Sequence, residues 1–180
     1  MSPDTVAAHL EIQQVLYRYC RGVDRGDEAM IASVYHSDGV DQHGPWKGVG
    51  RDLAPMVVRH MDQVGAIGQH HITNVLIEVQ GEVADVESYY IAFQPEITPN
   101  GPGQALTCGR YLDRFERRDG RWLIAEREVV MDVHRAQVGG SPWPGAPGFP
   151  AGGRRSRDAS AAMFTGAAKL SGCGEGAAKP

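Results

Sequence analysis

Two segments of the chain carry side chains suited to acid–base chemistry at the ends of predicted elements. Residues 19–27 close a predicted helix and read YCRGVDRGD, and residues 69–74 open a predicted strand and read QHHITN. A carboxylate beside an imidazole fixes the ring's tautomer and stabilises the imidazolium, which makes the ring an effective base near neutral pH. We therefore take Asp24 and His70 as a candidate pair for removing a proton.

Asp24 continues the apolar stripe of the first predicted helix. It lies four residues after Cys20 and eight after Leu16, a spacing that returns to the same helix face. A buried carboxylate needs a partner, and so does the hydroxyl of Tyr19 on the same stripe. Two structural roles stay open for Asp24: it caps the second helix, or it simply ends the first.

His70 meets Asp24 if its strand crosses the end of the first helix. The alternatives are a core histidine with other hydrogen-bond partners and an exposed strand residue. His71 points to the opposite face of a regular strand. Only one of the two neighbouring histidines is therefore expected in a pocket.

The elements that must position these residues follow from the hydrophobic period. Helical spacing predicts helices over residues 3–23, 27–37 and 50–64. From residue 68 a period of two predicts strands over 70–79, 82–94, 105–118 and 121–134. Turns are expected at 38–39, 80–81 and 119–120, and a Pro/Gly loop at 95–104. Helices followed by an antiparallel meander predict an α+β fold: a cone-shaped curved antiparallel sheet wrapped around the long N-terminal helix and enclosing a pocket.

Composition divides the 180 residues into one domain and a tail. Residues 1–138 have the pattern of a compact domain, whereas residues 139–180 are dominated by Gly, Pro and Ala without a hydrophobic period. Such a segment buries too little apolar area to offset its ordering entropy. The basic run Arg114, Arg117, Arg118 and Arg121 straddles the last predicted turn and is interpreted as a solvated face.

Bulk properties exclude several classes of function. A formal net charge of −4 gives no electrostatic reason to bind nucleic acid or an anionic membrane. The sequence shows neither a membrane span nor a signal peptide, so we expect a cytoplasmic protein. Three cysteines without metal spacing argue against a disulfide framework and a zinc cluster, and Cys20 is expected to be a small buried hydrophobe.

No cofactor is expected, because the chain has no Gly-rich phosphate loop and no dinucleotide-binding fingerprint. Asp41, His43 and His134 can be combined into a metal site on paper, but no ligand spacing supports it. We therefore expect no metal, and we interpret Asp41 as a candidate substrate-binding residue of the pocket.

The segments GVDRGD, HHITN and GRYLDRFERRDGRW resemble the SnoaL-like branch of the nuclear-transport-factor-two-like superfamily. Similar members include scytalone dehydratase, hexachlorocyclohexane dehydrochlorinase and bile acid 7α-dehydratase. The resemblance spans about residues 5–135. It implies a cone around a pocket and an assembly of two or three identical chains.

Carried over by position, the resemblance assigns the dyad and its neighbours. The family's aspartate falls on Asp24 and its histidine on His70. A polar pocket residue falls on Tyr19 and a basic one on Arg127, so that these four form the predicted catalytic set. Tyr111 falls on a substrate-binding position, whereas the choice between Tyr89 and Tyr90 as a pocket residue stays open.

The sequence thus predicts a cofactor-independent lyase of the dehydratase or dehydrohalogenase type. His70, oriented by Asp24, would take a proton from a carbon of a small hydrophobic ring compound, and Tyr19 or Arg127 would steady the leaving group or the enolate oxygen. Two alternatives stay open: an isomerase or polyketide cyclase with the same dyad, and a non-catalytic binding or partner module.

Overall fold

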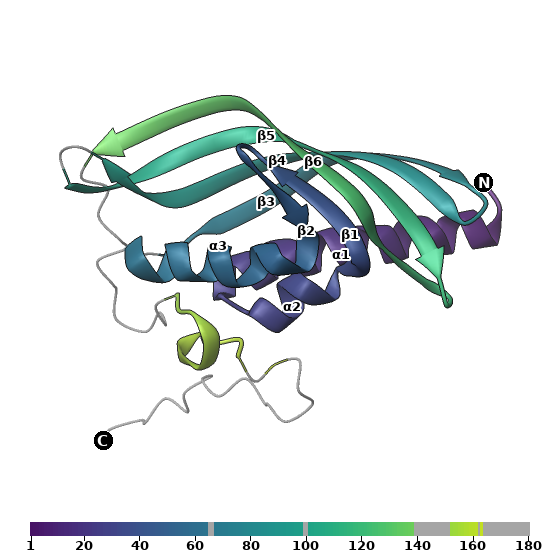
Figure 1. Cartoon of the computed structure of the whole chain (residues 1–180), viewed down its shortest axis with the longest axis horizontal. Coiled ribbons are helices and arrows are strands. Elements are labelled where there is room, and N and C mark those ends of the chain that lie inside the picture. The colour runs from purple at the N-terminus through teal and green to yellow at the C-terminus, as the bar shows by residue number, and fades with distance from the viewer. Residues whose placement is uncertain (65–66, 99–100, 139–151, 162, 164–180) are drawn as a thin grey trace, which may run out of the picture.

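The computed structural model of the chain describes residues 1–64, 67–98, 101–138, 152–161 and 163. Six strands form a sheet in the order β2-β1-β6-β5-β4-β3. The sheet curves strongly, and α1, α2 and α3 all lie on its concave side (Figure 1). The predicted fold class, a curved sheet over a long N-terminal helix, is confirmed.

Helix α1 (Pro3–Arg25) is bounded by signals that are readable in the sequence. Ser2 accepts a hydrogen bond from the backbone N–H of Thr5 at 3.2 Å, and Pro3 occupies the first turn, where a missing N–H is tolerated. Gly26 ends the helix with a left-handed φ of 68°, a conformation that glycine adopts without strain. The buried stripe of α1 includes Ile12, Val15, Leu16, Tyr19, Cys20 and Val23.

Helix α2 (Glu28–Ser33) starts where the sequence predicts and ends earlier. Asp27 caps it by accepting the backbone N–H of Met30 at 2.9 Å. The prediction that the helix runs to residue 37 is wrong, because β1 (Tyr35–His43) begins two residues after Ser33. Tyr35 is fully buried and pairs with Ile124, so burial in the sheet outweighs local helical propensity.

The predicted turn at residues 38–39 is also wrong, since both residues lie within β1. Gly39 serves a different purpose there. A Cβ atom at this position would lie 2.7 Å from the carbonyl oxygen of Ile124. The glycine therefore allows the backbones of β1 and β6 to approach closely, next to an irregularity in their register.

Strand β2 (Trp46–Val49) forms a hairpin with β1 and leads directly into α3 (Gly50–Val64). Strand β1 pairs with β6 in parallel, whereas the other pairings are antiparallel. The sheet is therefore mixed, and the expectation of a purely antiparallel sheet is corrected. The predicted third helix matches α3.

The meander consists of β3 (Gln69–Gln80), β4 (Val83–Thr98), β5 (Gly101–Arg118) and β6 (Arg121–Val138). The expected loop at 95–104 is wrong where the structure describes it, because residues 95–98 pair with 101–104. Pro95 is tolerated in β4 because β3 pairs no further along β4 than Phe93. Beyond that point one edge of β4 has no strand partner, so a missing N–H costs no ladder bond.

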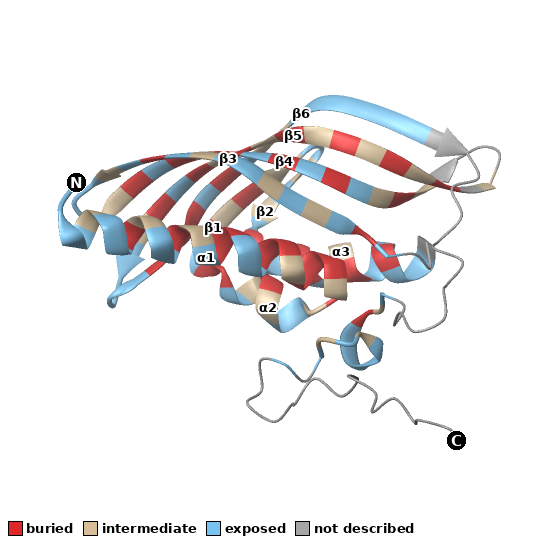
Figure 2. Cartoon of the chain, turned by 180° about the vertical axis from the view of Figure 1, so that it is seen from behind, coloured by how far each residue is buried: buried red, intermediate tan, exposed pale blue. Residues whose placement is uncertain are grey.

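Buried residues alternate with less buried ones along the strands: Figure 2 shows buried residues between mostly exposed ones in β4 and between mostly intermediate ones in β5. The concave face carries Val86, Tyr90, Tyr111 and Phe115 against the helices. His70 pairs with Ala92 on that face, whereas His71 lies on the convex face with Phe93, their ring centroids 6.3 Å apart. The expected split between the two histidines is confirmed.

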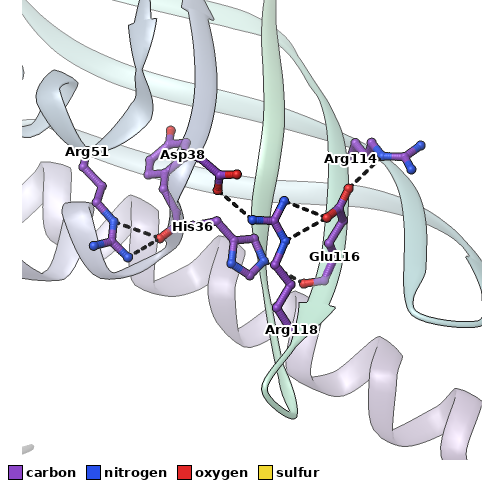
Figure 3. Close-up of polar contacts among 7 residues, drawn as sticks. His36, Asp38, Arg51, Arg114, Glu116 and Arg118 are labelled. Carbon is purple, nitrogen blue, oxygen red and sulfur yellow. Dashed lines mark hydrogen bonds and ion pairs between the residues drawn. The ribbon is translucent and has the colours of Figure 1, made fainter.

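Ion pairs tie β1 to β5 at the end of the sheet near the β5–β6 turn (Figure 3). Arg118 contacts Asp38 at 2.6 Å and Glu116 at 2.7 Å, and Arg114 contacts Glu116 at 3.2 Å. The pKa of the exposed Asp38 carboxyl is lowered by its hydrogen bond to Arg118. These arginine side chains are 40–45% exposed, so the basic run lies in solvent with acidic partners.

Part of the predicted tail is described and lies against the helices. Around the short helix η1 (Arg155–Arg157), Arg155 contacts Asp62 of α3 at 2.7 Å, and Asp158 contacts Arg25 of α1 at 3.4 Å. Residues 139–151, 162 and 164–180 lie outside the described part of the chain. Among the described helices, none has the length and apolarity to cross a membrane.

Candidate active site

His70 and Asp24 meet at the junction of β3 and the last turn of α1. The Nδ1 atom of His70 lies 2.6 Å from Oδ1 of Asp24, and the backbone N–H of His70 donates to Oδ2 at 3.0 Å. Both side chains are at least nine-tenths buried. One carboxylate therefore fixes both the backbone and the ring of the histidine.

The other ring nitrogen of His70 is oriented by Gln94 of β4. The amide nitrogen of Gln94 lies 3.1 Å from Nε2 of His70. Nδ1–H donates to Asp24, so Nε2 carries the lone pair and accepts from the amide. This is the tautomer that a general base requires, with the basic nitrogen on the side away from the carboxylate.

This nitrogen belongs to a cavity of about 430 Å³ between the sheet and the helices, lined by both His70 and Gln94. Most of the wall is apolar, and it includes Val23, Leu53, Val57, Met61, Val129 and Met131. An apolar cavity with a few convergent polar groups is the usual form of a small-molecule site.

A larger hollow of about 680 Å³ lies elsewhere, and its wall includes Glu78, Glu87, Glu126 and Lys47. No histidine lines this hollow among the described residues, so it offers no imidazole paired with a carboxylate. We assign the site to the smaller cavity because His70, whose imidazole is paired with Asp24, lines it.

Three tyrosines form an aromatic wall of the cavity. Tyr90 stacks on Tyr111 with ring centroids 4.7 Å apart, and Tyr19 meets the edge of Tyr111 at 5.6 Å. Burial raises the pKa of the Tyr19 and Tyr111 hydroxyls, so both remain neutral hydrogen-bond donors. The structure also distinguishes the neighbouring tyrosines, since Tyr90 lines the cavity and Tyr89 lies on the convex face.

Arg127 lies behind this wall. Its guanidinium stacks between the rings of Tyr19 and Tyr111, 4.4 Å and 4.2 Å from their centroids, and makes a bidentate pair with Asp113 at 2.7 Å. Both charged side chains are fully buried. Arg127 is absent from the wall of the 430 Å³ cavity, so its contacts position the tyrosines.

Asp41 is also buried behind the wall. Its Oδ2 accepts a hydrogen bond from Tyr35 at 2.5 Å, and its Oδ1 lies 3.5 Å from Nδ1 of His43. His43 itself lines the cavity. Asp41, predicted as a substrate-binding residue, is absent from the cavity wall, and sequence reasoning did not assign His43 to the pocket.

Gln94 and Asp113 were missed as well. The period-two pattern does place both residues on the buried face. Gln94 follows Tyr90 by four residues on β4, and Asp113 lies between Tyr111 and Phe115 on one face of β5. A polar residue in a series of buried apolar positions indicates a buried partner.

The hypothetical metal site of Asp41, His43 and His134 does not form. His134 lies 3.1 Å from Glu96, away from the other two. Across the described ranges, no three His, Cys, Asp or Glu side chains converge as metal ligands would. Cys20 is buried, and burial raises the pKa of its thiol to about 12. The thiol therefore stays uncharged, as expected for a small hydrophobic residue of the core.

Fold and site together define an open α+β cone with a His–Asp pair at an apolar cavity. The chain belongs to the SnoaL-like domain family, whose model matches residues 4–128. No curated protein matches the chain.

Solved structures with the same fold include proteins of known and unknown function. Rv3472 of Mycobacterium tuberculosis, described as a protein of unknown function, is 30% identical over 73% of this chain and 77% of its own, with a TM-score of 0.62. A hexachlorocyclohexane dehydrochlorinase of Novosphingobium barchaimii is 22% identical over 79% and 98%, with a TM-score of 0.68. A putative scytalone dehydratase of Novosphingobium aromaticivorans is 20% identical over 75% and 91%, with a TM-score of 0.65.

Proposed function

We propose that this protein is a cofactor-independent lyase that eliminates water or an acid from a small hydrophobic ring compound. The observation that carries the proposal is the double contact of Asp24 with the ring and backbone of His70, which leaves Nε2 at an apolar cavity. Two of the structures similar in fold belong to a dehydrochlorinase and a putative dehydratase, whose reactions are both eliminations.

The proposed reaction begins with removal of a proton from a carbon next to a carbonyl group. Nε2 of His70 takes the proton, and Asp24 stabilises the imidazolium that forms. The neutral hydroxyl of Tyr19 donates to the carbonyl oxygen as it gains negative charge. The electron pair of the broken C–H bond then forms the double bond as the leaving group departs from the next carbon.

Gln94 supports both protonation states of the base. Its amide nitrogen donates to Nε2 of the neutral ring, and after a rotation its amide oxygen accepts from Nε2–H of the imidazolium. Substrate must displace or share this contact to present its proton. Gln94 is therefore placed to keep the base aligned between turnovers.

Simple ring ketones test the proposal. Exchange of the protons next to the carbonyl of cyclohexanone, followed by NMR in D₂O, measures proton removal alone. Conversion of 3-chlorocyclohexanone to cyclohexenone, followed by absorbance, measures elimination. We expect His70→Ala and Asp24→Asn to lower both rates by about 10²–10⁴-fold.

The matched control is His71→Gln, one residue away on the convex face, and it should retain both rates. Unchanged rates in the His70 and Asp24 variants contradict the proposed role of the dyad. Exchange without elimination by the wild-type protein favours the isomerase or cyclase alternative. Neither reaction in the wild-type protein favours a binding module.

A further inference from the structure

The cavity holds a second imidazole with a buried carboxylate behind it. His43, at the end of β1, lines the cavity together with Gly44 and Pro45 of the β1–β2 turn. Its Nδ1 is buried and lies 3.5 Å from Oδ1 of Asp41. The side chain is 36% exposed in all, so the accessible edge is the one that bears Nε2.

In the described part of the chain, the Asp41 carboxylate has one oxygen free to accept a hydrogen bond from His43. The carboxylate is completely buried, and Tyr35 satisfies only Oδ2. Oδ1 has no hydrogen bond among the described residues, and neither does Nδ1 of His43. Two buried unsatisfied groups that face one another are costly, and a small movement of the imidazole would join them.

The two imidazoles reach the cavity from different parts of the sheet. His70 lies on β3, His43 lies on β1, and β6, β5 and β4 separate these strands in the sheet order. A ring compound in the cavity therefore has one imidazole supplied from the β3 side and another from the β1 side. This arrangement suits an elimination whose leaving group must be protonated as it departs, because one imidazole can take the proton while the other donates one.

We propose that His43, positioned by Asp41, is the general acid of the reaction, and that the natural leaving group is a hydroxyl. The inference rests on the proposed lyase function and narrows it to dehydration. Chloride departs as a stable anion and needs no proton, whereas hydroxide is a poor leaving group unless an acid protonates it. Elimination of a halide would therefore not need a second imidazole that acts as an acid.

The step balances in protons and electrons. The C–H pair becomes the new double bond while its proton moves to Nε2 of His70. The C–O pair stays on oxygen, which takes the proton from Nε2 of the His43 imidazolium and leaves as water. Both imidazoles line the cavity, so bulk water returns them to their starting protonation states after product release.

Tyr19 is less suited to this role. It is 2% exposed with its ring against Arg127, and burial raises its pKa. Its hydroxyl therefore stabilises charge by a hydrogen bond and gives up a proton reluctantly. His43, by contrast, is 36% exposed and lies beside the Asp41 carboxylate.

The test compares leaving groups on one carbon skeleton. 3-Hydroxycyclohexanone and 3-chlorocyclohexanone both give cyclohexenone, and only the first requires an acid. In His43→Gln we expect elimination of water to fall by about 10²–10⁴-fold and elimination of chloride to change by less than about threefold. Asp41→Asn should shift the ratio of the two rates in the same direction, and the double variant should lose no more than His43→Gln alone.

Each outcome bears on one of the two proposals. Equal losses on both substrates in His43→Gln, or no loss on either, overturn the role of His43 and leave the His70 dyad standing. Loss of both reactions in His70→Ala beside a selective loss in His43→Gln supports both assignments. A wild-type protein that eliminates neither leaving group contradicts the proposed function and the inference with it. His43 is partly exposed, so its variants are expected to fold, and the thermal midpoint checks this.

Discussion

A buried ion pair holds the aromatic wall of the site in place. Arg127 and Asp113 are fully buried, and the guanidinium is enclosed by the rings of Tyr19 and Tyr111. Removing one member of such a pair leaves an uncompensated buried charge, whereas replacing both by apolar groups is often neutral. The pair thus fixes the position of the tyrosines more than it adds stability.

We expect Asp113→Leu to lower the free energy of unfolding by about 3–5 kcal/mol, because it leaves the Arg127 charge buried alone. The double variant Asp113→Leu with Arg127→Met should recover most of that loss. Urea unfolding followed by circular dichroism measures both. If the single variant loses less than about 1 kcal/mol of unfolding free energy, the Arg127 guanidinium must be hydrated or paired with another group, and the prediction is contradicted.

The contact between Asp24 and His70 could be predicted from the sequence, whereas the side chains around it could not, for a physical reason. Helical spacing places Asp24 on the buried face, and period two separates His70 from His71. Which side chains surround a buried residue depends on strand register, which small irregularities alter. The partner of Arg127 is an example.

Counting from the Asp119–Gly120 turn in strict alternation places Leu112 opposite Arg127. The structure pairs Asp113 with Arg127, because β6 skips Ala125 between the pairs of Ile124 and Glu126. This one extra residue turns Arg127 to the concave face. A bulge of one residue inverts all later faces of a strand, and nothing in the local residue types marks it.

At the level of elements, the sheet depends on close backbone approach at Gly109. A Cβ atom there would overlap the carbonyl oxygen of Val130 and lie 2.7 Å from the hydroxyl of Tyr90. The position faces the concave side at a register shift between β5 and β6. Neither the backbone of β6 nor the stacked tyrosine can move without disturbing the cavity wall.

We expect Gly109→Ala to destabilise the protein by about 1–3 kcal/mol through this overlap and to weaken binding of a ring ketone to the cavity. Thermal unfolding and equilibrium titration measure the two effects. Gly81→Asn is the matched control, because Gly81 has a φ of 64° in open space and asparagine tolerates that conformation. Equal stability of Gly109→Ala and wild type would contradict the close packing of β5 on β6.

Element boundaries were predictable where local signals act alone. Ser2 and Gly26 bound α1, and the positive φ angles of Asp119 and Gly120 form the hairpin turn that their sequence predicts. The start of β1 and the extension of β4 past Pro95 were not predictable. Both depend on which strand lies alongside, and this is a property of the whole sheet.

At the level of the whole molecule, the convex face of the sheet carries exposed apolar side chains. Tyr89, Ile91, Phe93 and Val133 are each more than a third exposed. Tyr89, Ile91 and Phe93 lie on β4 and Val133 on β6, and Cys108 of the intervening β5 joins them, since Ile91 pairs with Cys108 and Cys108 with Val133. Contiguous exposed apolar surface of this kind marks an interaction site.

We expect this face to bury itself against a second copy of the chain, as the family resemblance implies for an assembly of two or three subunits. Phe93→Glu should then shift the mass measured by light scattering to that of a single chain of 19.5 kDa, because a charge in an apolar interface lacks a partner. Leu10→Glu, a change at an exposed apolar residue of α1, is the control and should leave the mass of the assembly unchanged. A wild-type protein that is monomeric at micromolar concentration would contradict the burial of the convex face against a second copy of the chain. The cavity lies on the concave side, so Phe93→Glu should reduce assembly without abolishing the chemistry of His70.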